Sequence, residues 1–212
     1  MRIHKTINNP YLRGNYAPVN HLTRQTELTW SGQIPDDLNG LFVRNGPNPM
    51  KPPKASRHHW FAGEGMLHGV RLEQGRALWY RNQTVDARGS TPNTHVIGHA
   101  GHLYALVEAG GAPVEVDDQL DMLNTPAFQN TLPRGFSAHT KFEASTGALH
   151  AICYDFKRGY QLSYVQIGAD NRLAEHHTIK LPSRSMVHDC ALTKNYILIF
   201  DLSITFSPSR LI

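Results

Sequence analysis

The chain has 212 residues, of which 40% are hydrophobic and 18% are charged, proportions that are ordinary for a folded globular protein. Its formal net charge is +4, yet lysine and arginine never form a run of five or more, which argues against nucleic acid as a partner. The N-terminus lacks the apolar stretch of a signal peptide, and no apolar run is long enough to span a membrane. We therefore expect a cytoplasmic protein, with peripheral membrane contact left open.

Short apolar runs separated by glycine, asparagine, aspartate and proline recur along the chain, and no window keeps a helical period for long. This pattern predicts an all-β fold, and a sandwich, a barrel and a propeller all stay open. Four prolines in the stretch 47–60 predict a surface loop there. The expected strands, in chain order, are 40–44, 67–72, 77–83, 103–108, 114–117, 138–142, 148–155, 162–167, 173–181, 186–192 and 196–201.

Two hairpins of the same design favour the propeller. His139 opens the first hairpin and His188 opens the second, 49 residues later, and propeller repeats recur at about 40–50 residues. Two imidazoles at equivalent positions of neighbouring blades would both point at the central axis, where a metal ion can bind. The alternative is two unrelated histidines in a core. The two cysteines, Cys153 and Cys190, lie in apolar strand patterns and predict reduced core thiols.

Other candidate motifs are weak. His95 and His99 have the spacing of a helical zinc pair, but the residues between and after them do not favour a helix. Gly63-Glu64-Gly65 resembles the start of a dinucleotide fingerprint, yet the third glycine is missing and no βαβ unit surrounds it. Nucleophile-elbow, P-loop and CxxC motifs are absent from the sequence.

Ordered similarity over nearly the whole chain points to one family. The chain resembles the N-terminal part of the carotenoid cleavage oxygenases, a family that also contains lignostilbene dioxygenases and the retinoid isomerase of the eye. The similar stretches are 9–19, 32–49, 60–69, 99–108 and both histidine hairpins. The resemblance implies that residues 1–212 form the N-terminal part of a single seven-bladed β-propeller domain, with roughly three to four blades present.

The same resemblance implies one non-haem Fe(II) on the propeller axis, held by four histidines from different blades. His139 and His188 match the first two of these ligands. Glu108 matches one of the family's glutamates that accept a hydrogen bond from a ligand histidine and fix its orientation; a solvent-exposed glutamate is the alternative. Which histidine Glu108 would hold stays open. His95 stands where the family commonly has asparagine, and we do not expect it to bind the metal.

The implied reaction is oxidative cleavage of a carbon–carbon double bond by O2, with an apolar polyene, a carotenoid or apocarotenoid, as substrate. Lignostilbene-type members tend to place a lysine where this chain has Val107, so an apolar pocket wall favours the polyene over a stilbene. The third and fourth histidines of the family pattern lie beyond Ile212. We therefore expect this chain alone to be an inactive fragment. A non-catalytic propeller remnant that binds a partner and an unrelated β-domain are the rival interpretations.

Overall fold

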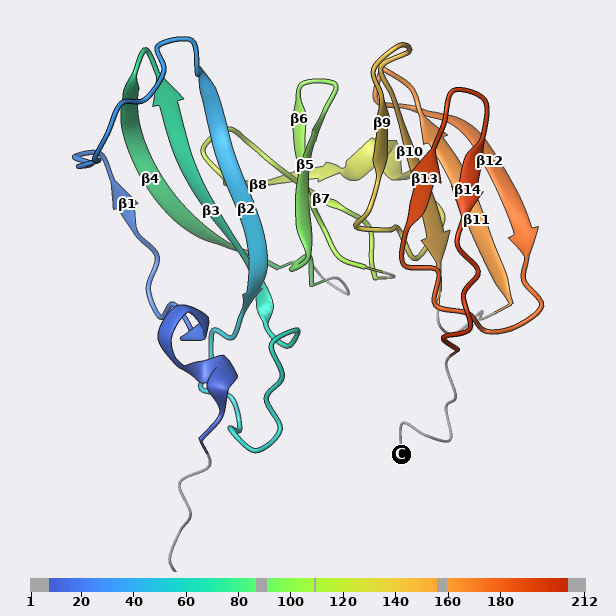
Figure 1. Ribbon diagram of the computed structural model, residues 1–212, viewed down its shortest axis with the longest axis horizontal. Coiled ribbons are helices and arrows are strands. Elements are labelled where there is room, and N and C mark those ends of the chain that lie inside the picture. Colours follow the sequence, from blue (N-terminus) through green and yellow to red (C-terminus); the bar gives the residue numbers. More distant parts are fainter. Residues whose placement is uncertain (1–7, 87–90, 109, 156–159, 206–212) are drawn as a thin grey trace, which may run out of the picture.

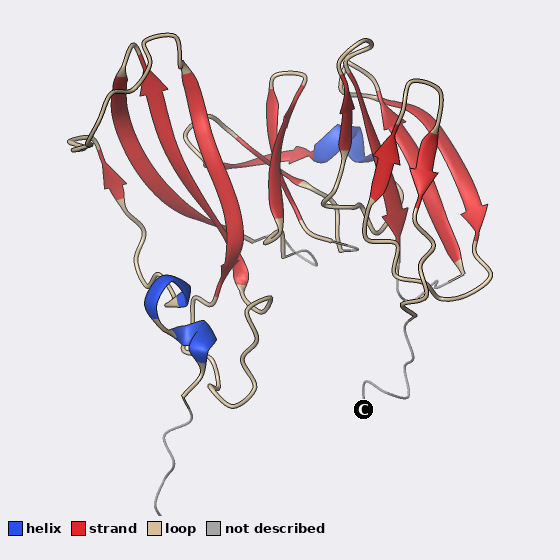
Figure 2. Ribbon diagram, in the orientation of Figure 1, coloured by secondary structure: helices blue, strands red, loops and turns tan. Residues whose placement is uncertain are grey.

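The computed structural model describes residues 8–86, 91–108, 110–155 and 160–205, which form four antiparallel β-sheets and no α-helix (Figures 1 and 2). The helical segments in these ranges are three short 3-10 turns, η1 (Pro10–Leu12), η2 (Gly14–Tyr16) and η3 (Ala127–Asn130). The predicted all-β class is confirmed. In the described ranges, no helix has both the length and the apolar character needed to cross a bilayer.

The first sheet has the strand order β1-β4-β3-β2. Its members are β1 (Arg24–Gln25), β2 (Gly40–Asn48), β3 (Glu64–Glu73) and β4 (Arg76–Val85). Strand β2 continues through Pro47, which pairs with Gly65 of β3, so the predicted loop over 47–60 is wrong at its start. Proline fits there because β2 lies at the edge of its sheet, where a missing N–H removes no ladder bond.

The other three sheets follow one another along the chain. The second sheet contains β5 (His95–His99), β6 (His102–Leu106), β7 (Val114–Val116) and β8 (Met122–Pro126) in sequential order. The third has the order β12-β11-β10-β9 and the fourth has only the pair β13-β14 in the described residues. Their members are β9 (Lys141–Glu143), β10 (Ala148–Tyr154), β11 (Gln161–Ile167), β12 (Leu173–Lys180), β13 (Cys190–Leu192) and β14 (Ile197–Ile199).

In Figure 1 the first sheet lies on the left, the second in the middle and the third and fourth on the right, and β2, β9 and β13 each lie on the side of their sheet that faces the middle. Strand β2 contacts β5, and β9 contacts β13. Three complete sheets and the first two strands of a fourth therefore have the arrangement of consecutive propeller blades, as the sequence predicts.

A separate apolar cluster fills each of the three gaps between neighbouring sheets. Leu67 and Val85 pack against Ala105 in the first gap. Tyr104 and Leu106 pack against β10 in the second, and β10 packs against Val187 and Cys190 in the third. The chain's two cysteines are buried and free, as expected.

Strand alternation explains how one sheet can serve two gaps. Successive side chains of a strand point to opposite faces, so Ala105 of β6 faces the first sheet while Tyr104 and Leu106 face the third. All seven residues of β10 are buried for the same reason. A strand that is covered on both faces has a nearly continuous apolar sequence rather than an alternating one.

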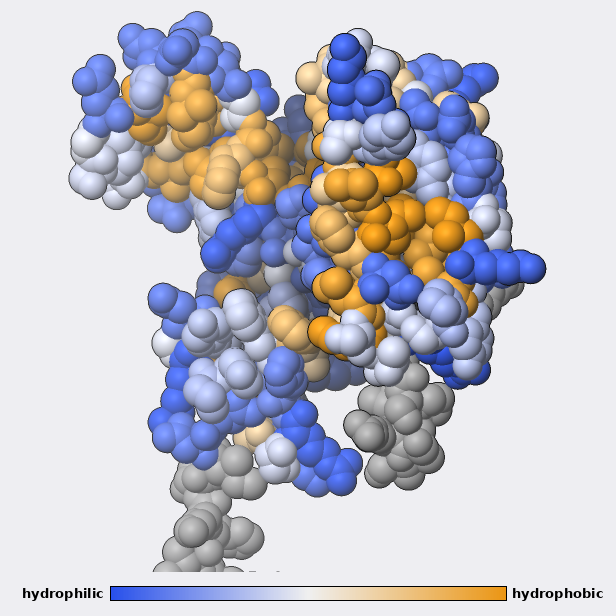
Figure 3. Space-filling view, turned by 45° about the vertical axis from the view of Figure 1, so that its right-hand side comes forward, coloured by the Kyte–Doolittle hydropathy of each residue, from blue (hydrophilic) through white to orange (hydrophobic). Residues whose placement is uncertain are grey.

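The fourth sheet leaves an apolar area on the surface. Strand β14 has β13 on one side and no strand on the other among the described residues. Figure 3 shows a continuous hydrophobic area on the side of the molecule that this sheet forms. The exposed hydrophobic residues along this part of the chain are Tyr196, Leu198, Phe200, Leu202 and Ile204.

Candidate metal centre

Glu108, His139 and His188 come from three neighbouring sheets and meet at one point. Glu108 follows the end of β6, whereas His139 lies two residues before β9 and His188 two residues before β13. The sequence places both histidines inside extended strands that begin at 138 and 186, and this detail is wrong, because β9 and β13 begin only at Lys141 and Cys190.

Side-chain hydrogen bonds explain why the strand starts late. The Ala138 N–H donates to Oε2 of Glu108 over 2.9 Å, and the His139 N–H donates to the Ser137 hydroxyl over 3.0 Å. These backbone donors are then no longer available to a sheet ladder. The segment before β9 is consequently held by side chains and presents the His139 ring at the end of the blade.

The donor atoms of this group are close together. One ligand atom from each of Glu108, His139 and His188 lies within 4.8 Å of the others, and the two imidazole ring centroids are 4.4 Å apart at an interplanar angle of 54°. Glu108 and His139 are half-buried and His188 is exposed. The structure thus brings together the two histidines and the glutamate that the sequence singles out.

Glu108 contacts both histidine segments. Its Oε2 accepts the Ala138 N–H next to His139 and a longer 3.5 Å bond from the Ser137 hydroxyl. Its Oε1 lies 4.0 Å from Nδ1 of His188, and the buried Tyr154 hydroxyl also interacts with this carboxylate. Of the two imidazoles, His188 is therefore the one whose Nδ1 lies near Oε1 of Glu108.

Two buried residues of the third sheet, Cys153 and Tyr154, lie near Glu108. Burial, and to a smaller extent the Glu108 charge, raises the pKa of the Cys153 thiol to about 12. Burial and the same carboxylate also raise the pKa of the Tyr154 hydroxyl well above its usual value. Both groups stay protonated at neutral pH.

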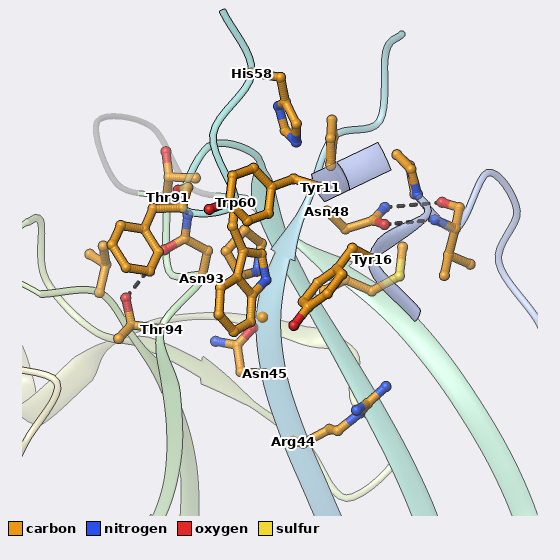
Figure 4. Close-up of a pocket in the computed structure, with 18 of the residues that line it drawn as sticks. Tyr11, Tyr16, Arg44, Asn45, Asn48, His58, Trp60, Thr91, Asn93 and Thr94 are labelled. Carbon is orange, nitrogen blue, oxygen red and sulfur yellow. Dashed lines mark hydrogen bonds between the residues drawn. The ribbon is translucent and has the colours of Figure 1, made fainter. Parts of the chain in front are cut away.

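A cavity of about 770 Å³ opens onto the group. Val107, Glu108 and His188 line one part of it, and Tyr16, Trp60 and other residues of the N-terminal segments line another. In Figure 4, Trp60 lies next to Tyr16, and their ring centroids are 5.1 Å apart. Val107 lies on the wall of the same cavity.

The aromatic part of this wall is not evident from the sequence. Tyr16 and Trp60 are far apart in the chain and have no periodic relation to each other or to Val107. Their neighbourhood depends on how the segment before β1 folds back along β2, where the side-chain amide of Asn48 bonds to both backbone groups of Val19. A hydrogen bond from an asparagine side chain to the backbone of a distant residue has no signal in the local sequence.

The other paired histidines have a structural role or lie outside the group. His95 and His99 are on β5 rather than on a helix, as expected. His99 is buried and its Nε2 contacts the Gly168 carbonyl oxygen over 2.9 Å, which joins the second and third sheets. Burial, and secondarily the nearby His139, lowers the pKa of His95, but His95 is not among the grouped donors.

The donor set fits a transition metal such as iron(II). Neutral imidazoles suit iron, zinc and copper, and a carboxylate beside an imidazole fixes the ring or adds a hard oxygen ligand. Two nitrogens on one ion, each at about 2.0–2.1 Å, are at most about 4.2 Å apart. The observed grouping within 4.8 Å therefore needs only a small side-chain adjustment.

The chain is similar to known proteins over nearly its whole length. The chain matches the family described as retinal pigment epithelial membrane protein over residues 16–90 and 85–212. It is 39% identical to a carotenoid cleavage oxygenase of Mycobacterium tuberculosis over 96% of this chain and 45% of that protein. It is 31% identical to a carotenoid 9,10(9',10')-cleavage dioxygenase of Crocus sativus over 95% of this chain and 45% of that protein.

Solved structures show the same fold. The lignostilbene dioxygenase of Pseudomonas brassicacearum superposes with a TM-score of 0.86 at 25% identity, over 96% of this chain and 49% of that one. A Synechocystis apocarotenoid oxygenase variant superposes with a TM-score of 0.77 at 18% identity, over 90% of this chain and 48% of that one. The chain spans about half the length of the curated relatives it matches. It belongs to the family of retinal pigment epithelial membrane protein and the carotenoid cleavage oxygenases.

Proposed function

We propose that this chain carries part of the iron centre of a dioxygenase that cleaves a carbon–carbon double bond of a carotenoid or apocarotenoid. The observation that supports this function best is the meeting of Glu108, His139 and His188 at the ends of three sheets, beside a cavity that Val107 lines. Iron(II) would supply the activation of O2 when it is bound.

The chain's own residues would prepare the site for that chemistry. His139 and His188 would hold the metal through ring nitrogens. Glu108 would accept a hydrogen bond from Nδ1 of His188, which lies 4.0 Å from its Oε1, and this would leave Nε2 as the metal-binding atom. Because Glu108 also holds the backbone at Ala138, one carboxylate would orient both imidazoles.

The cavity supports a polyene as substrate. Val107 presents an apolar side chain next to Glu108. The phenol oxygen of a stilbene would therefore meet no cation at this position. Tyr16 and Trp60 provide flat apolar surface farther along the wall. Such walls bind an extended conjugated chain by burial of area and restrain one double bond near the donor group. The rival substrate within the family is a phenolic stilbene.

We also propose peripheral contact of the protein with a membrane, from which it would take its apolar substrate. The supporting observation is the exposure of Tyr16, Trp60 and Phe61 near the cavity, with Phe61 73% exposed. Aromatic side chains of this kind insert at the level of lipid headgroups.

The two imidazoles are half of the four that the family resemblance implies. We therefore propose that these 212 residues bind metal weakly and do not turn over substrate by themselves, and that the active protein contains two further histidines from other blades. A non-catalytic propeller remnant is the rival, because the described residues alone supply an incomplete donor set.

Two measurements test the proposal. The first is metal binding by this chain, and the second is catalysis by any longer product of the same reading frame. Anaerobic loading followed by desalting measures iron per chain, with His139→Ala and His188→Ala as the matched variants. We expect a weak one-ion site that both variants lose, and O2-dependent loss of apocarotenoid absorbance only in the longer product. The proposed centre is contradicted if the unmodified chain binds no iron, or if both variants bind iron as well as the unmodified chain does.

A further inference from the structure

An ion pair joins the chain immediately next to both candidate metal ligands. Nζ of Lys141 lies 2.7 Å from Oδ1 of Asp189. Lys141 is two residues after His139, and Asp189 directly follows His188. We propose that Lys141 and Asp189 are positioning residues that set the separation of the two imidazoles, an inference that rests on the metal site proposed above.

The pair connects the starts of two strands that share no ladder. Lys141 is the first residue of β9, at the edge of the third sheet, and it pairs in register with His150 of β10. Oδ1 of Asp189 also accepts the N–H of Cys190, the first residue of β13, over 2.7 Å. The same carboxylate oxygen therefore holds β13 by its backbone and β9 by the lysine.

This contact complements the one that Glu108 makes. Glu108 reaches from the second sheet to the backbone beside His139 and to the ring of His188. Lys141 and Asp189 join the same two segments on the other side of the histidines along the chain. The segment of His139 is thus held on both sides, by Glu108 at Ala138 and by the ion pair at Lys141, whereas Asp189 holds the chain directly after His188, and the two rings lie 4.4 Å apart between these contacts.

The solvent exposure of Lys141 and Asp189 allows a positioning role to be distinguished from a contribution to folding stability. The side chains of Lys141 and Asp189 are 30% and 44% exposed, and exposed ion pairs contribute little to folding stability. At a functional site, in contrast, a displacement of a reacting group by about 1 Å strongly lowers the rate of the reaction. Loss of the pair should therefore change the metal site while the free energy of unfolding stays nearly the same.

The experiment compares variants that remove only the charge of one partner. Asp189→Asn keeps an oxygen that can accept the Cys190 N–H, and Lys141→Met keeps the length of the side chain. Lys141→Arg retains the ion pair. The control is Asp121→Asn, which breaks the equally short Arg81–Asp121 pair between the first and second sheets, away from the donor group.

Two readouts are taken on the 212-residue chain. The first is Co²⁺ affinity, from the visible absorption of the bound ion. The second needs no metal: it is the nuclear Overhauser contact between the labelled imidazole rings of His139 and His188. We expect Asp189→Asn and Lys141→Met to lower Co²⁺ affinity by about 10-fold and to weaken the ring contact. Lys141→Arg and Asp121→Asn should resemble the unmodified chain, and thermal midpoints should agree throughout.

The two readouts separate this inference from the proposed function. If the unmodified chain binds no Co²⁺ and the ring contact still depends on the pair, the positioning role holds and the metal site fails. An unchanged ring contact in Asp189→Asn and Lys141→Met overturns the positioning role, whatever the metal does. If either variant unfolds, the role is structural and the inference is wrong, because folding was expected to be nearly unaffected.

Discussion

Replacement of Glu108 by glutamine tests the centre through a residue that need not bind the metal itself. The side chains have nearly the same shape, and the glutamine oxygen can still accept the Ala138 N–H that Oε2 now binds over 2.9 Å. What is lost is the negative charge and the acceptor that faces Nδ1 of His188 at 4.0 Å. The variant therefore alters the orientation of the imidazoles more than it alters the fold.

The expected magnitudes follow from these contacts. A charge-assisted hydrogen bond becomes a neutral one at Ala138, which costs about 1 kcal/mol of folding free energy. A domain with about 5–15 kcal/mol of stability stays folded after such a loss. Loss of a partner that orients a ligand lowers metal affinity by about 10–100-fold, which corresponds to about 1.4–2.7 kcal/mol of binding free energy.

The assay is a Co²⁺ titration of the folded chain beside thermal unfolding of the metal-free chain. Glu115→Gln is the matched control, because Glu115 is a buried carboxylate on the second sheet that contacts Nδ1 of His102 over 2.6 Å and accepts the Thr125 hydroxyl. This control should lose stability and keep its Co²⁺ affinity. Normal affinity in Glu108→Gln would refute the orienting role. Equal losses of affinity in both variants would show that the effect is a general loosening of the sheet.

The cavity wall, the open sheet edge and the buried thiol allow further tests. Val107→Lys should weaken binding of an apocarotenoid aldehyde by about 10-fold and strengthen that of a 4-hydroxystilbene in fluorescence titrations; an unchanged preference would remove Val107 from the wall. Leu198→Lys should reduce self-association of the chain in size-exclusion chromatography, because a charge on the exposed β14 edge opposes pairing with another strand; association at the same concentration would contradict this. Burial raises the pKa of Cys153 from 9.0 to about 12, so its contribution to stability is present below the unfolded pKa and is lost as pH rises toward the folded one. Urea unfolding at about pH 8 and about pH 10 should show this loss, and Cys153→Ala should reduce it.

Local sequence was sufficient for the strands that are covered on both faces. The apolar run over 148–155 predicts a strand that the structure contains as β10. The periodicity of side chains along a strand is a property of neighbouring residues, so it can be recognised without knowledge of the partner sheet. The same holds for the repeat of the two histidine hairpins, which indicates consecutive blades.

Strand boundaries near the site depended on contacts between distant residues. The delayed start of β9 follows from the bond between Glu108 and the Ala138 N–H, and the extension of β2 through Pro47 follows from its place at a sheet edge. Neither partner is visible in the local pattern, because a hydrogen bond across about thirty residues has no fixed spacing in sequence.

The sequence by itself determined the all-β class, the blade repeat and the candidate donors His139 and His188, because residue type and periodicity are encoded locally, whereas Glu108 was indicated by the family resemblance. Only the tertiary structure decided that Glu108 faces His188 and that Lys141 meets Asp189. It also decided that Trp60 shares a cavity with Val107. These contacts depend on how whole sheets pack against one another, and that packing is set by the apolar clusters between the blades rather than by any single segment.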